Sequence, residues 1–228
     1  MKESSYMTSN SQGLAGIKAG STAISAAGGD HDLEYRGYSV EDLAANCIFE
    51  EVAYLIIHGK LPNTDELEDY KAHLTSLRKL PKSLRAVLEK VPSSAHPMNM
   101  LQAATSFLGT IKPEIDSFSP GGEAQKLIAD QLVAIYPAVI AYWWRRHHKN
   151  QESPDVTNDS DTVAEYFLKA LLQKDVLDLH KQAMNVALIL YAEHEFNAST
   201  FTARTIASTI SDFYSAVSGA IGALRGPL

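Results

Sequence analysis

Hydrophobic positions recur every three or four residues along most of the chain, which is the spacing of one face of an α-helix. The clearest stripe consists of Leu67, Tyr70, Leu74 and Leu77, and a longer one runs from Leu127 to Trp143. Asn63 with Glu66 three residues later predicts a capped start for the first stripe. By the same reasoning, the other predicted helices span residues 40–46, 49–58, 84–88, 98–108, 162–172, 179–194, 199–212 and 214–224.

Glycine and proline predict where these helices end or bend. Gly59 should end the second helix, and Gly109 should stop the helix over 98–108. Pro137 lies inside the long stripe and should kink that helix, because proline removes one backbone hydrogen bond. The helix over 179–194 becomes apolar nearly all round by its end, which predicts burial.

Polar stretches predict exposed segments. The string RRHHKN at 145–150 is interpreted as a solvated helix end, where the helix dipole favours positive charge. The string KNQESPDVTNDSD at 149–161 is the most polar part of the chain and predicts an exposed connection.

The N-terminal region is the least helical part of the sequence. Six glycines lie between Gly13 and Tyr38, where TAIS and LEYRG flank the turn-rich string AAGGDHD. This pattern predicts a short β-hairpin of two strands around a Gly-Gly-Asp turn. Residues 1–12 are predicted to be disordered. The predicted fold class is therefore all-α with a small N-terminal β-hairpin.

Composition narrows the possible functions of the 228 residues. Hydrophobic residues make up 45% and charged residues 21%, as in a globular protein. A net charge of −7 gives no global basic field that would hold nucleic acid or an anionic membrane. The single Cys47 cannot form an internal disulfide and is interpreted as a small core residue. No secretory signal and no uninterrupted apolar run of about 18 residues is present, so we expect a cytoplasmic protein.

Common nucleotide, hydrolase and metal motifs are absent from the sequence. GAIGALRG resembles a glycine-rich phosphate loop only superficially, because its glycines at 219, 222 and 226 lie within a helical pattern. Small residues at 216, 219, 220 and 223 favour close helix packing instead. His147 and His148 are neighbours that face different directions, so no metal site is predicted.

His194 is the histidine in the most unusual setting. It follows the most apolar helix, in the string YAEHEFNAST, and Asn197 comes three residues later. A polar cluster at the end of a buried helix is costly unless its groups are satisfied. On residue types alone two interpretations remain. Asn197 and Ser199 could cap the next helix with His194 bonded to that cap, or His194 could bind a ligand.

Several long strings resemble one family. EYRGYSVEDLA, FEEVAYLIIHGKLP, SAHPMNMLQAATSFLG and YAEHEFNASTFTARTIASTISDFYSAVSGAIGALRGPL are similar to segments of citrate synthases, in the same order. The segment YAEHEFNASTFTAR is most similar to the corresponding segment of bacterial 2-methylcitrate synthases. The resemblance covers the chain from about Gly13, and it implies a multi-helical large domain.

The resemblance also implies chemistry. The family condenses an acyl-coenzyme A with oxaloacetate as a homodimer, and the 2-methylcitrate branch uses propionyl-CoA in propionate breakdown. Matched to the family motif, His194 and Asn197 are expected to bind substrate oxaloacetate. No cofactor is implied beyond the acyl-CoA substrate. Gln102 stands where related enzymes commonly carry arginine, and it is interpreted as a surface or packing difference.

In the family, the string GPL is followed by His-Gly-Gly, whose histidine stabilises the enol intermediate. That histidine, the catalytic aspartate, the carboxylate-binding arginines and the CoA-binding loop are expected beyond Leu228, so no catalytic residue is assigned in this chain. Residues 13–228 are predicted to be the N-terminal part of the large domain, without the small domain. The chain alone is predicted to be inactive and to need its C-terminal portion. The alternatives are a citrate synthase that uses acetyl-CoA and a non-catalytic short paralogue that acts as a helical interaction module.

Overall fold

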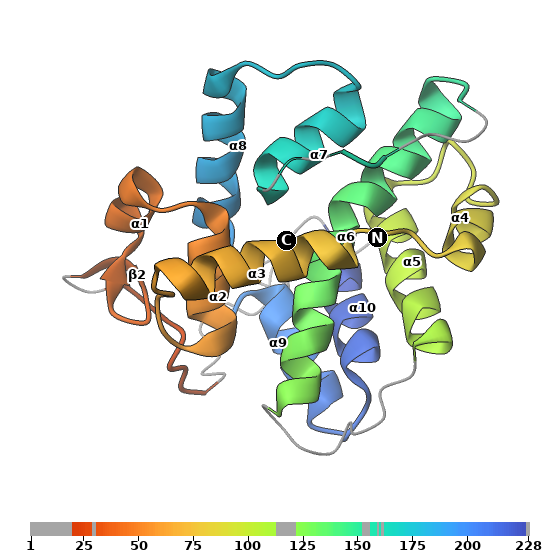
Figure 1. Cartoon of the computed structure of the whole chain (residues 1–228). Helices are drawn as coiled ribbons and strands as arrows, with labels where there is room; N and C mark the ends of the chain where they lie inside the picture. The colour runs from red at the N-terminus through yellow and green to blue at the C-terminus, as the bar shows by residue number, and fades with distance from the viewer. Residues whose placement is uncertain are drawn as a thin grey trace, which may run out of the picture.

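The computed structural model describes residues 20–28, 31–112, 122–151, 156–158, 160 and 162–226. The predicted disordered segment 1–12, the last two residues and most of the loop between 112 and 122 lie outside these ranges. Within them the chain forms ten helices and one small sheet (Figure 1). The predicted all-α class with a small N-terminal β element is therefore confirmed.

The sheet has three antiparallel strands in the order β1-β2-β3, which are β1 (Ser25–Gly28), β2 (His31–Tyr35) and β3 (Tyr38–Ser39). Ser25 pairs with Tyr35, so the predicted hairpin is present, although its first strand starts later than the string TAIS. The third strand was not predicted, and Glu34 pairs with Ser39 on it. Arg36 and Gly37 form the turn before β3 with φ values of 49° and 85°.

Ten described helices follow with short connections. They are α1 (Val40–Asn46), α2 (Phe49–His58), α3 (Thr64–Leu77), α4 (Lys82–Leu88), α5 (Pro97–Ile111), α6 (Glu123–His148), α7 (Val163–Leu172), α8 (Asp178–Leu190), α9 (Ala198–Ala207) and α10 (Phe213–Ala223).

The predicted cap of α3 and the predicted end of α2 are confirmed. Asn63 and Glu66 form a capping box at the start of α3, and the Thr162 side chain accepts a hydrogen bond from the backbone N–H of Glu165. Gly59 ends α2 with a left-handed φ of 95°. These local signals need only neighbouring residues, so the sequence alone is sufficient to identify them.

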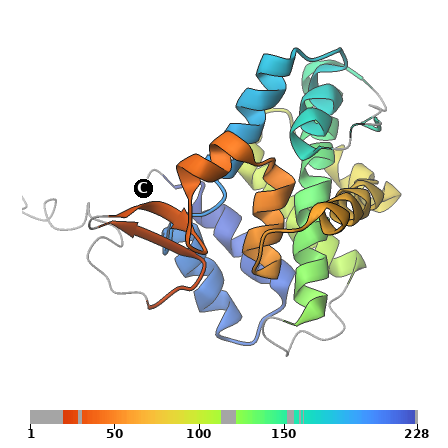
Figure 2. The ribbon, with the colours of Figure 1, turned by 60° about the vertical axis from the view of Figure 1, so that its left-hand side comes forward.

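The long helix α6 forms the centre of the fold. Ile135, Val139 and Trp143 are at most 2% exposed, and α6 continues through Pro137 as one 26-residue helix. Helices α3, α5 and α7 pack against it, with α7 crossing near its C-terminal half (Figures 1 and 2). Within the described ranges, only α6 is long and apolar enough to span a membrane. Most of its apolar stretch is buried, and core packing accounts for that composition.

Three predictions about helix ends are wrong. Helix α5 continues past Gly109 to Ile111. Gly109 serves packing rather than helix termination, since a methyl group added to it would lie only 3.0 Å from Cβ of Tyr214. The end of α8 is not buried, since Leu190 is 45% exposed. The helix predicted over 199–212 ends earlier, at Ala207.

The predicted solvated segments are partly buried. Arg145 is 1% exposed and donates to the carbonyl oxygen of Ala170 at 2.8 Å, so the end of α6 is held against α7. Val156 and Ser160, in the polar connection, are 3% and 4% exposed. The low hydropathy of these strings therefore did not predict their burial, because the acceptor that satisfies Arg145 lies on α7 and meets it only when the helices pack.

A buried polar cluster joins α2, α3 and α6. Asp130 is 2% exposed and accepts a hydrogen bond from the Tyr70 hydroxyl at 2.8 Å. The Nε2 atoms of His58 and His73 lie 3.5 and 3.6 Å from the other carboxylate oxygen. Among the described residues, no group of three or more His, Cys, Asp or Glu side chains is arranged to hold a metal ion.

The small residues of α10 allow two close helix contacts, as predicted. An added methyl group on Gly219 would lie 2.2 Å from Cδ1 of Ile206 on α9. On Gly222 it would lie 2.7 Å from Nε2 of Gln102 on α5. The Gln102 side chain therefore packs on a helix of this chain, in agreement with its interpretation as a packing difference.

We predict that Gly219→Ala destabilises the chain although alanine favours helix. The overlap with Ile206 should cost about 1–3 kcal/mol, whereas the gain in helix propensity is about 1 kcal/mol. Urea unfolding of Gly219→Ala, Ile206→Val and the double variant measures the coupling. Ile206→Val removes the clashing Cδ1 atom, so the double variant should recover most of the loss. A Gly219→Ala variant as stable as the parent chain would contradict the packing described here.

Candidate functional site

His194 and Asn197 lie in the turn between α8 and α9, and the fold brings their side chains together. Nδ2 of Asn197 lies 3.1 Å from Nε2 of His194, and the imidazole is exposed. Glu195 between them has a φ of 67°, a left-handed conformation that turns the backbone toward α9. The two residues singled out from the sequence therefore form one local unit at the surface.

The cap of α9 fixes the orientation of the Asn197 amide. Its Oδ1 accepts hydrogen bonds from the backbone N–H of Thr200 at 2.8 Å and from the Ser199 hydroxyl at 2.5 Å. The amide oxygen is thereby assigned to the helix, and the Nδ2 donor faces His194. Asn197 therefore caps α9 and contacts His194 at the same time. This geometry agrees with the interpretation of Asn197 as a helix cap, and it leaves His194 able to bind a ligand.

This orientation also selects the tautomer of the neutral His194 ring. An amide N–H can only donate, so Nε2 of His194 must accept with its lone pair. The neutral ring then carries its proton on Nδ1. The result is an exposed N–H donor that can bind a carbonyl or carboxylate oxygen.

The β-hairpin holds the turn that carries His194. The Tyr35 hydroxyl donates to the carbonyl oxygen of Ile189 at 3.0 Å and accepts from the backbone N–H of Glu193 at 3.4 Å. The Tyr35 side chain is fully buried, and burial is the main reason why its pKa is raised. The phenol is therefore protonated at neutral pH and available as a donor.

Ser25 on β1 makes the second connection. Its hydroxyl donates to Oε1 of Glu193 at 3.1 Å and accepts from the backbone N–H of Glu195 at 3.0 Å. Figure 2 shows the hairpin beside the connection from α8 to α9. Tyr35 and Ser25 were not predicted as site residues, because the sequence carries no signal for contacts that span more than 150 positions.

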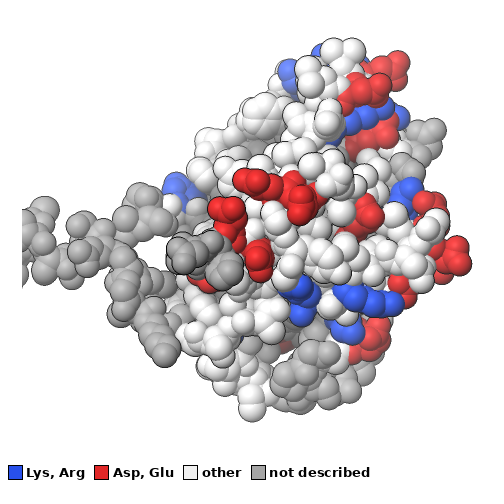
Figure 3. Space-filling model, turned by 90° about the vertical axis from the view of Figure 1, so that its left-hand side faces the viewer, with Lys and Arg blue, Asp and Glu red and all other residues white. Residues whose placement is uncertain are grey.

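Charge around the hairpin is predominantly acidic. Figure 3 shows the face on which the hairpin and α1 lie, where carboxylates gather and few Lys or Arg side chains intervene. Close to the turn, the guanidinium carbon of Arg204 on α9 lies 4.6 Å from the centre of the Phe196 ring. This face offers no basic field for a polyanion.

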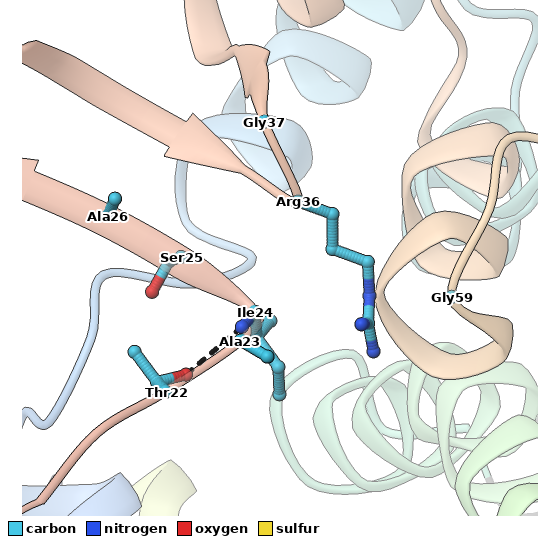
Figure 4. Close-up of a pocket in the computed structure, with 8 residues that line it drawn as sticks. All are labelled: Thr22, Ala23, Ile24, Ser25, Ala26, Arg36, Gly37 and Gly59. Carbon is cyan, nitrogen blue, oxygen red and sulfur yellow. Dashed lines mark hydrogen bonds between the residues drawn. The ribbon is translucent and has the colours of Figure 1, made fainter.

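A shallow hollow lies at the base of the hairpin but does not include His194 or Asn197 (Figure 4). Its volume is about 390 Å³, and it is lined by Thr22, Ala23, Ile24, Ser25, Ala26, Arg36, Gly37 and Gly59. The Arg36 side chain crosses it and donates to the carbonyl oxygen of Ile56 at 2.9 Å. That contact satisfies the C-terminal end of α2, so the arginine has a structural role there.

The sequence of this chain matches the family model described as "Citrate synthase, C-terminal domain" over residues 13–228. The chain belongs to the citrate synthase family. The match includes the hairpin, the turn at His194 and all ten described helices.

Individual relatives agree with this assignment. The chain is 51% identical over 217 residues to "2-methylcitrate synthase" of Shewanella oneidensis, covering 95% of this chain and 56% of that protein. It is 39% identical over 220 residues to "Citrate synthase" of Mycolicibacterium smegmatis, covering 95% of this chain and 57% of that one. The chain therefore spans somewhat over half the length of these relatives.

The fold agrees as well. A crystal structure of citrate synthase from Thermoplasma acidophilum, in ternary complex with carboxymethyl coenzyme A and oxaloacetate, superposes with a TM-score of 0.84 at 31% identity. The superposition covers 95% of this chain and 56% of the archaeal one. The helical arrangement described above is thus that of citrate synthases.

Removing one hydroxyl should loosen the turn that carries His194. We predict that Tyr35→Phe lowers the free energy of unfolding by about 1–2 kcal/mol, because it removes the buried bond to Ile189 and the acceptor for Glu193. Urea unfolding measures the loss, and amide exchange at Glu193 should become faster. The control is Tyr38→Phe, whose side chain is 45% exposed and whose loss should be near zero. Equal effects of the two substitutions would contradict this role of Tyr35.

The cap and the histidine contact can be separated at Asn197. Asn197→Ala should cost about 1 kcal/mol of stability because α9 loses its cap. Asn197→Asp keeps the acceptor for Thr200 and should remain within about 0.5 kcal/mol of the parent chain. Thermal unfolding followed by circular dichroism compares the two variants. Equal destabilisation by alanine and aspartate would show that the cap is not what Asn197 contributes to stability.

Proposed function

We propose that this chain is the N-terminal portion of a 2-methylcitrate synthase. The enzyme condenses propionyl-CoA with oxaloacetate and water, and gives 2-methylcitrate and CoA. The observation that carries the proposal is the 51% identity to a protein of that name, against 39% to a protein named citrate synthase. The reaction would serve propionate catabolism in the cytoplasm.

Within this reaction His194 and Asn197 bind oxaloacetate. The exposed Nδ1–H of His194 is a suitable donor to a keto or carboxylate oxygen, because Asn197 occupies the other ring nitrogen. The contacts of Ser25 and Tyr35 keep the turn in place, so that the ring is oriented before substrate arrives. Preorganised donors of this kind lower the cost of binding and of charge development.

The remaining chemistry needs further groups beside the His194 turn. Condensation requires a base that removes a proton next to the thioester, a donor that stabilises the enol, and cations for the oxaloacetate carboxylates. We propose that these groups belong to a C-terminal portion, as the family resemblance implies, and that the complete enzyme is a homodimer. We propose no metal and no cofactor, since acyl-CoA is a substrate.

The isolated 228-residue chain should therefore release no CoA from propionyl-CoA and oxaloacetate. A thiol reagent that detects free CoA measures the reaction, and the S. oneidensis relative serves as positive control. Intact-mass analysis verifies that the assayed chain ends at Leu228. Turnover by a verified 228-residue chain would contradict the proposed division of catalytic groups.

A second candidate is citrate synthase, which uses acetyl-CoA, and the M. smegmatis relative favours it. One methylene in an apolar pocket changes discrimination by about 1–3 kcal/mol, or roughly 10–200-fold. The ratio of kcat/KM for propionyl-CoA and acetyl-CoA, measured on the complete protein, decides between the two. A ratio below one would contradict the 2-methylcitrate assignment. If the complete protein turned over neither substrate, the non-catalytic paralogue would remain.

A further inference from the structure

Two arginines beside the C-terminal half of α6 form no ion pair. Arg85 lies on α4 and Arg146 lies in the last turn of α6. Among the described residues, neither side chain makes a hydrogen bond or lies within salt-bridge distance of a carboxylate. The Nε atom of each is buried and without a hydrogen-bond partner. Both arginine residues are partly exposed to solvent.

Both guanidinium groups lie near one phenol. The Arg85 carbon Cζ is 5.7 Å from the centre of the Tyr142 ring. The pKa of Tyr142 is raised, first by burial and then by its hydrogen bond to Glu89, while the charges of Arg85 and Arg146 act in the opposite direction. Tyr142 and Arg146 are four residues apart on α6 and therefore lie on the same face of that helix.

Two arginines and one carboxylate lie beside Tyr142 at the seam between α4 and α6, and Lys82 lies on the same face of α4. Lys82, Arg85 and Glu89 are spaced three and four residues apart and thus lie on one face of α4. Oε1 of Glu89 accepts a hydrogen bond from the Tyr142 hydroxyl at 2.7 Å. We name these side chains the α4–α6 seam; they are Lys82, Arg85, Glu89, Tyr142 and Arg146.

Ordinary explanations account for only part of this arrangement. A cation in the last turn of a helix is favoured by the helix dipole, which explains why Arg85 and Arg146 stand at these positions. It supplies no counter-anion for either guanidinium group. Such groups are normally satisfied, because an unpaired buried donor costs about 1–3 kcal/mol.

We propose that the α4–α6 seam is a binding site for a phosphate-type oxyanion. The planar guanidinium groups match the oxygen geometry of phosphate, and each can donate two hydrogen bonds to it. Lys82 adds a third charge from the same face of α4. The site is separate from the His194 turn, and it does not depend on the proposed condensation reaction. Glu89 opposes the anion, so the seam binds phosphate less tightly than its cations alone would.

Inorganic phosphate is the probe that tests the site. Isothermal titration of the 228-residue chain with phosphate, at ionic strength held constant with chloride, should give a dissociation constant of about 1 mM or lower. Arg85→Gln and Arg146→Gln should each weaken binding by about tenfold or more. Arg225→Gln removes the same charge at an exposed position after α10 and should leave binding unchanged.

For Glu89→Gln we expect stronger rather than weaker phosphate binding. A gain in affinity cannot result from misfolding, so this variant controls for the arginine substitutions. It removes the repelling charge, so phosphate should bind about threefold to tenfold more tightly. Circular dichroism verifies that each titrated variant is folded. No binding at 10 mM phosphate would overturn the proposal. So would equal affinities in the parent chain and both arginine variants, or a Glu89→Gln variant that binds more weakly than the parent chain.

Discussion

The fold depends on the burial of α6, because nearly every other helix of the large core packs on it or on a neighbour that does. An apolar helix of this length would be insoluble unless its faces were covered. Its polar side chains give the covering helices specific positions. Asp130 accepts from Tyr70 on α3, Tyr142 donates to Glu89 after α4, and Arg145 donates to Ala170 on α7. If one of these partner helices shifted by one turn along α6, its hydrogen bond would break and a buried polar group would lose its partner. The three hydrogen bonds therefore fix the positions of the partner helices along α6.

The turn at His194 depends on a different set of contacts. It lies at the end of α8, away from the centre of α6, and α9 after it has no fully buried residue. Its position is set by Tyr35 and Ser25, which join it to the hairpin. The hairpin is thus a positioning element for the turn, and its small size is consistent with that role. A short sheet supported by α1 and α2 can fix two hydrogen bonds without forming a core of its own.

The sequence correctly predicted structural features that depend on residues close together in the chain. The capping box at Asn63, the left-handed Gly59 and the stripe through Leu74 follow from local rules, and all are present. The proximity of His194 and Asn197 also follows, because three residues separate them across a cap. The sequence could not predict Tyr35, Ser25 or the pairing of His58 and His73 with Asp130. Those contacts arise only when the helices pack, and polar strings give no sign that Arg145 is buried.

The misjudged end of α8 bears on the proposed assembly. Its apolar composition predicted burial, yet Leu177, Leu179 and Leu190 are between 45% and 70% exposed, and Tyr191 is 86% exposed. Leu177 and Leu179 lie at the start of α8 and Leu190 and Tyr191 at its end, so both ends of the helix expose large apolar side chains of the kind that often mark a binding surface. The composition of α8 therefore suits a covered helix, and its exposure in the single chain supports the proposal that a second subunit or a C-terminal portion completes the protein. His194 lies four residues after the end of α8, so the same covering element would lie beside the proposed oxaloacetate site.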